Sequence, residues 1–95
     1  MITKEQENII IEKTRPFKPE RIGIFGSYAR NEQTKESDLD ILVNFRERIN
    51  LLDIVGLEQE LSDLLGMKVD LITEKSVDKK LRSYIRKDLK LILDD

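Results

Sequence analysis

The chain contains neither cysteine nor histidine. The first absence excludes disulfides, thiolate catalysis and cysteine-ligated zinc, and the second removes the usual general base and the commonest transition-metal ligand. Any catalysis by these 95 residues must therefore use carboxylates, hydroxyls, cations and hard metal ions. An excess of one charge is also missing, because 17 basic residues nearly balance 19 acidic ones and leave a formal charge of −2. This balance gives no overall electrostatic reason to expect direct nucleic-acid binding.

Long apolar runs are missing as well. No segment approaches the roughly 20 apolar residues of a membrane span, and residues 1–13 are too charged for a signal peptide. We therefore expect a cytoplasmic protein without a membrane segment. The sequence shows no linker, internal repeat or low-complexity segment, so residues 1–95 are expected to form one domain. A domain of this size buries only about 60–70% of its unfolded surface, which argues against a deep, enclosed active site.

Two helices are predicted from their capping signals. A capping box at its start predicts a helix over residues 3–14. Asn50 can cap a second helix, whose apolar stripe runs through residues 51–65. Gly66 follows this stripe at the position where a left-handed residue commonly ends a helix.

Three strands are predicted between and after these helices. Residues 21–25 are rich in β-compatible side chains, and residues 39–45 and 67–72 alternate aliphatic with polar side chains. Ser76 can cap a last helix. Residues 90–93 could extend that helix or form a short edge strand, and the pattern does not separate the two.

The most informative segment is residues 26–43, GSYARNEQTKESDLDILV. Gly26 and Ser27 follow the first expected strand and precede a single helical turn over residues 28–32. Free N–H groups and a partial positive charge at such a turn favour phosphate oxygens. Arg30, on the same turn, could add a cation.

Three aspartates are candidate metal ligands. Asp38 and Asp40 open the second strand, where side chains two positions apart leave the same face, and Asp70 adds a carboxylate from the third strand. Two carboxylates roughly 4 Å apart repel by about 1 kcal/mol in water and about 4 kcal/mol at an effective dielectric of 20, which implies a polar, open or metal-filled site. With oxygen ligands only, the expected ion is Mg²⁺, which bridges carboxylates to nucleotide phosphates. These parts fit phosphoryl-type transfer, with Asp70 as a base or a shared ligand.

Each feature also has a simpler interpretation. A Gly-Ser pair alone is usually a turn and an isolated Asp-x-Asp a solvated strand end, so the joint spacing with Asp70 carries the argument. Arg30 could be an ordinary surface charge, and Tyr28 favours packing over stacking on a base. Ser37, a further candidate for nucleotide binding, more often orders a turn. The basic residues between positions 79 and 87 favour a solvated helix face over a binding patch.

At these residues the sequence resembles the DNA polymerase beta-like nucleotidyltransferase superfamily, whose signature is a Gly-Ser, a short helix, an Asp-x-Asp and a third Asp on a later strand. The residues that match are Gly26, Ser27, Asp38, Asp40 and Asp70. Within the superfamily, the GSYAR and SDLD runs and the compact length resemble the minimal nucleotidyltransferase (MNT) antitoxins that partner HEPN ribonuclease toxins. The resemblance covers residues 21–72 and implies an α+β fold, with a small mixed sheet of three to four strands and helices packed on one face.

The resemblance implies transfer of AMP from Mg-ATP to a tyrosine of the cognate toxin, with which the chain would form a hetero-oligomer. Catalysis and metal binding would fall to Asp38, Asp40 and Asp70, and nucleotide binding to Gly26, Ser27, Arg30 and Ser37. Asn31 stands where the family often has glycine, and asparagine is the residue after glycine that best tolerates a positive φ.

Two other functions remain open at this point. A non-catalytic antitoxin would neutralise the toxin by binding and occlusion, and its carboxylates would then be dispensable. Nucleotidyl transfer to a small molecule such as an aminoglycoside would use the same signature, but the missing second domain argues against it.

Overall fold

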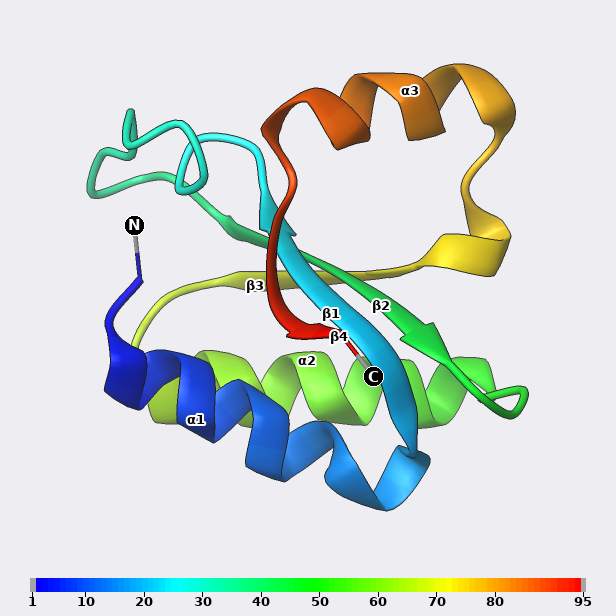
Figure 1. The fold of residues 1–95 in the computed structure, drawn as a ribbon. Helices are drawn as coiled ribbons and strands as arrows, with labels where there is room; N and C mark the ends of the chain where they lie inside the picture. The colour runs from blue at the N-terminus through cyan, green and yellow to red at the C-terminus, as the bar shows by residue number, and fades with distance from the viewer. Residues whose placement is uncertain (1, 95) are drawn as a thin grey trace.

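The computed structural model describes residues 2–94 and shows a four-stranded mixed sheet between helices (Figure 1). The sheet has the order β3-β2-β1-β4, in which β1 is antiparallel to β2 and β4, and β2 is parallel to β3. The mixed sheet confirms the expected fold class. The strands are β1 (Pro19–Phe25), β2 (Leu39–Phe45), β3 (Val69–Thr73) and β4 (Lys90–Asp94), and the helices are α1 (Lys4–Thr14), α2 (Leu51–Leu65) and α3 (Lys79–Asp88), with 3₁₀ turns η1 (Arg15–Phe17) and η2 (Glu74–Ser76).

The caps of α1 and α2 are those that the sequence predicts. The Thr3 hydroxyl accepts from the Gln6 N–H at 3.1 Å while Gln6 Oε1 accepts from the Thr3 N–H at 2.8 Å, which completes the capping box. Asn50 Oδ1 accepts from the Asp53 N–H at 2.8 Å, and Gly66 ends α2 at φ 69°. Among residues 2–94, no helix has the length and apolar character that crossing a membrane requires.

The main core lies between α1, α2 and one face of the sheet (Figure 1). The odd-numbered side chains of β2 point into this core and the alternate ones leave the other face, as the alternation predicts. Burial of these aliphatic side chains is the main source of stability for so small a sheet. The largest fully buried residues are Ile10, Thr14, Ile22, Ile24, Leu39, Ile41, Val43 and Leu61.

The helix α3 packs on the opposite face of the sheet, so the expected packing of helices on one face describes α1 and α2 alone (Figure 1). The physical reason is a second apolar cluster, in which Ile85 of α3 and Val77 pack on Leu42 of β2. Phe25, Ile72 and Leu89 surround this cluster. The alternate face of the strands is therefore apolar enough in its middle to hold a helix.

Around α3 the structure corrects one sequence prediction, the helix cap, and decides one that the sequence leaves open, the conformation of residues 90–93. Asp78, and not Ser76, caps α3, since its carboxylate accepts from the Leu81 N–H at 2.9 Å. Ser76 belongs to the preceding turn η2, where its hydroxyl donates to the Thr73 carbonyl at 2.9 Å. Residues 90–94 form the edge strand β4, which settles the choice between helix and strand.

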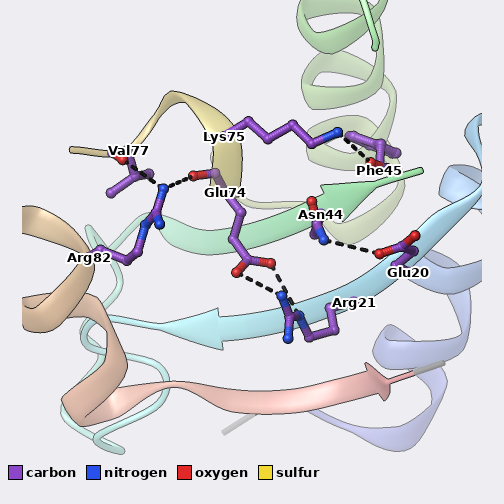
Figure 2. A network of polar contacts seen from close by, with 8 residues as sticks. All are labelled: Glu20, Arg21, Asn44, Phe45, Glu74, Lys75, Val77 and Arg82. Carbon is purple, nitrogen blue, oxygen red and sulfur yellow. Dashed lines mark hydrogen bonds and ion pairs between the residues drawn. The ribbon is translucent and has the colours of Figure 1, made fainter. Parts of the chain in front are cut away.

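A polar network fixes the start of α3 to the sheet (Figure 2). Arg21 of β1 donates from Nε and Nη2 to the two carboxylate oxygens of Glu74, at 3.2 and 3.1 Å. Arg82 of α3 donates from Nη2 to the backbone carbonyls of Glu74 and Val77, both at 3.2 Å. Because bidentate Arg–carboxylate pairs fix geometry well, this network sets the orientation of α3 across the sheet.

Candidate active site

The three predicted aspartates gather at one edge of the sheet. Asp40, near the start of β2, pairs in register with Asp70 of the parallel strand β3 and with Phe25 of β1 on its other side. Asp38 immediately precedes β2, and its carboxylate lies 3.7 Å from Lys68 Nζ. The parallel pairing of β2 and β3 is what brings Asp70 beside Asp40, although the two are far apart in sequence.

The cluster is electrostatically unfavourable for Asp40. Burial raises the pKa of this half-buried carboxyl, and the negative charges of Asp70 and Asp38 raise it further. The positive charge of Arg30 acts in the opposite direction and lowers the pKa of Asp40, but it does not cancel the other effects. The site therefore holds more negative charge than the protein itself compensates.

Replacing Asp40 by asparagine should stabilise the free protein near neutral pH. Because its folded-state pKa lies above the ordinary value of 3.8, Asp40 costs no stability below that pH and costs progressively more as the pH rises through the raised pKa. We expect Asp40→Asn to raise the free energy of unfolding at pH 7 by about 0.5–2 kcal/mol, as for other destabilising active-site groups. Urea denaturation at pH 7 and pH 3.5 measures this gain, and a gain of equal size at both pH values would refute the electrostatic explanation.

Gly26 brings a tight turn directly against Asp40. Its φ is 77°, and the space where a Cβ would lie is occupied by the Asp40 carboxylate, whose Cγ is 3.3 Å away. Beyond Gly26 the chain makes one hydrogen-bonded turn, in which the Arg30 N–H donates to the Gly26 carbonyl at 3.1 Å and the Glu32 N–H to the Ser27 carbonyl at 2.9 Å. The N–H groups of the residues between Gly26 and Arg30 lie at the start of this turn. Amides that bind a phosphate would have to lie at such a position.

The turn is anchored in the main core. Ala29 is 3% exposed, and Tyr28 packs against the same cluster, which confirms that Tyr28 has a packing role. Asn31 has φ 59°, so asparagine adopts the left-handed conformation here, at the position where the family that the sequence resembles often has glycine. The substitution therefore preserves the path of the turn.

Ser37 orders the loop before Asp38. Its hydroxyl accepts from the Thr34 N–H at 2.8 Å, and its own N–H donates to the Thr34 carbonyl at 3.1 Å. This confirms the turn-ordering role that the sequence favours, while a contact with nucleotide stays a prediction.

Arg30 is paired with two acids. Its Nη1 donates to Asp88 Oδ2 at 2.7 Å, and its Nε lies 3.6 Å from Glu32 Oε2. Sequence reasoning missed Asp88, because nothing in the local pattern links residues 58 positions apart. It also missed Lys68 as the neighbour of Asp38, although Lys68 and Asp70 are two positions apart in the strand predicted over residues 67–72, where alternation places both on one face.

The chemistry of the site fits a hard divalent cation. Its donors are carboxylate oxygens, and their mutual repulsion in a half-buried position is what a divalent ion would relieve. Within residues 2–94, no group of three or more acidic side chains already has the spacing that holds a metal ion. The aspartates therefore supply suitable donors whose side chains would need to converge on the ion.

The mixed sheet, the Gly-Ser turn and the acidic cluster agree with a nucleotidyltransferase domain. Residues 4–92 match the family model for the nucleotidyltransferase domain, and the chain belongs to this family. Nucleotidyltransferases of this family generally use a divalent metal, in agreement with the donor set.

Known relatives narrow the class further. Protein adenylyltransferase MntA of Thermococcus cleftensis is 42% identical over 82 residues, which cover 81% of this chain and 83% of the relative. A crystal structure of a toxin-antitoxin with AMP-PNP matches with a TM-score of 0.86 and 30% identity, covering 94% of this chain and 73% of that one. The structure of tri-AMPylated Shewanella oneidensis HEPN toxin in complex with MNT antitoxin matches with a TM-score of 0.81 and 26% identity, covering 99% and 74%. The resemblance to the MNT antitoxins is thus confirmed.

Proposed function

We propose that this protein transfers AMP from Mg-ATP to a tyrosine hydroxyl of a cognate HEPN toxin and thereby neutralises it in the cytoplasm. The observation that carries the proposal is the convergence of Asp40, Asp70 and the Gly26 turn at one edge of the sheet. The adenylyltransferase relative and the AMPylated toxin complex support the same reaction.

The roles follow from the chemistry of each group. Asp38 and Asp40 would hold Mg²⁺, which when bound neutralises phosphate charge and orients an in-line displacement. The Gly26–Ser27 turn and Arg30 bind phosphate oxygens. The tyrosine oxygen forms a bond to the α-phosphorus, the bond to the β-phosphate oxygen breaks, and pyrophosphate leaves with its electron pair. Asp70 accepts the proton of the tyrosine hydroxyl.

The open position of the acidic cluster favours a protein acceptor. The Asp38 side chain is 37% exposed, and Lys68 beside it is 71% exposed, so the cluster lies at the surface. A partner that covers this edge of the sheet would exclude water and supply the missing wall of the pocket. A tyrosine presented on such a partner fits this requirement better than a free aminoglycoside.

A ribonuclease assay on the reconstituted pair separates catalysis from occlusion. Preincubation of the toxin with wild-type protein, ATP and Mg²⁺ should remove its ribonuclease activity, and Asp40→Asn should leave that activity largely intact. The exposed Asp63→Asn, on α2, serves as a matched charge control and should protect like the wild type. Full protection by an Asp40→Asn protein that still binds the toxin would establish occlusion instead of transfer.

A further inference from the structure

We infer that Asp88 is a positioning residue for Arg30, which it holds beside the acidic cluster for contact with nucleotide phosphates. This inference rests on the proposed function, since it assigns Arg30 to phosphate binding. Asp88 is the last residue of α3, and its Oδ2 accepts from Arg30 Nη1 at 2.7 Å. The pair therefore joins the end of α3 to the turn that follows β1.

The geometry leaves Arg30 able to bind an anion. A guanidinium carries five N–H donors, and the contacts with Asp88 and Glu32 involve Nη1 and Nε. Among residues 2–94, neither contact uses the two N–H groups of Nη2, which remain for a phosphate oxygen. Arg30 lies on the turn that begins at Gly26, where its N–H donates to the Gly26 carbonyl, and Gly26 itself lies directly against the Asp40 carboxylate. Asp88 accordingly orients Arg30 without withdrawing it from the site.

The packing of Leu89, the next residue along the chain, fixes the position of Asp88. A Cβ on Gly23 of β1 would lie 3.1 Å from Leu89 Cγ, so the absence of a side chain at Gly23 lets Leu89 pack closely on the strand. Leu89 also packs against the cluster formed by Leu42, Val77 and Ile85. At the other end of α3, the network in Figure 2 fixes the helix start to β1. Asp88 therefore reaches Arg30 from a well-held segment of the chain.

Helix stability alone does not explain a carboxylate at this position. The C-terminal end of a helix carries a partial negative charge and disfavours a negative side chain in the last turn. Asp88 nevertheless occupies the last position of α3, with its side chain only 22% exposed beside Arg30. The contact with Arg30 supplies the compensation that the helix end lacks.

Calorimetric titration of Mg-ATP into Asp88→Ala tests the role of Asp88. We expect the Kd for Mg-ATP, and the KM in AMP transfer, to rise about 10-fold, the lower end of what loss of an orienting partner costs. The turnover number should change much less, and the thermal midpoint should not fall. Asp88→Glu, which restores the carboxylate, should recover part of the affinity. Asp63→Ala removes a carboxylate from the last turn of α2 and should bind as the wild type does.

The Arg30→Ala variant, used as a second starting protein, shows whether Asp88 acts through Arg30. In Arg30→Ala, which already lacks the guanidinium, adding Asp88→Ala should cause no further loss of affinity. An unchanged Kd in the single Asp88→Ala variant, or an equal loss in both backgrounds, would overturn the inference while the wild type still binds and transfers. If the wild type bound no Mg-ATP, the proposed function would fail and this inference with it.

Discussion

Asp40→Asn is expected to lower the rate of AMP transfer to the toxin by at least about 10²-fold, the loss typical of removing one group that stabilises charge in the transition state. The substitution keeps the shape of the side chain but removes the central carboxylate of the cluster, between Asp38 and Asp70. The cluster would then lack one of the three negative charges that would draw a divalent ion to this edge of the sheet. Transfer of label from α-labelled ATP to the toxin measures the effect.

Two comparisons make this result specific. Asp38→Asn should cause a loss of similar size, whereas Asp63→Asn on α2 should transfer like the wild type. Because Asp40→Asn is also expected to be more stable than the wild type at pH 7, unfolding cannot account for its lost transfer. Undiminished label transfer by both Asp38→Asn and Asp40→Asn would remove the acidic cluster from the mechanism.

Gly26→Ala is expected to damage both stability and transfer. A non-glycine residue in the left-handed region costs roughly 1–2 kcal/mol, and here the added Cβ would also collide with the Asp40 carboxylate. Since about 1 kcal/mol corresponds to 4–8 °C for a domain of this size, the thermal midpoint should fall by more than about 4 °C. Displacement of a catalytic group by about 1 Å can cost 10²-fold in rate, so transfer should fall by a similar factor.

Gly66→Ala is the matched control for this prediction. Gly66 also has a positive φ, 69°, but no atom of the residues that the structure describes lies within 4 Å of the position of its Cβ. Gly66→Ala should therefore lower the thermal midpoint through backbone strain alone and leave transfer unchanged. Equal losses of transfer in the two variants would show that the contact between Gly26 and Asp40 has no part in catalysis.

The elements around the site could be predicted because their signals are local. The alternation in residues 39–45 shows which side chains of β2 face the core and which face the site. Asn50 and Gly66 mark the two ends of α2. The Asp-x-Asp spacing fixes two carboxylates on one face of a strand before any tertiary structure is known. The outcome for these elements agrees with the sequence, since each depends on residues within a few positions of one another.

The features that escaped prediction depend on contacts between distant segments. The ion pair between Arg30 and Asp88 joins residues 58 positions apart. The placement of α3 on the face of the sheet opposite α1 and α2 depends on the packing of Ile85 against Leu42. The sequence does not reveal that Asp78 caps α3, because Ser76 belongs to the preceding 3₁₀ turn η2 and the helix begins two residues later than Ser76 suggests. Packing between distant segments determines such contacts, and local propensity does not predict them.

Intact-mass measurement of the cognate HEPN toxin tests the central claim most directly. The toxin is incubated with this protein, ATP and Mg²⁺, and its mass is compared with that of toxin incubated without ATP. We predict a gain equal to one or more adenylyl groups, located on tyrosine by peptide mapping and absent with Asp40→Asn. An unchanged toxin mass, or a gain equal to a phosphate, would contradict adenylyl transfer as the function of this site.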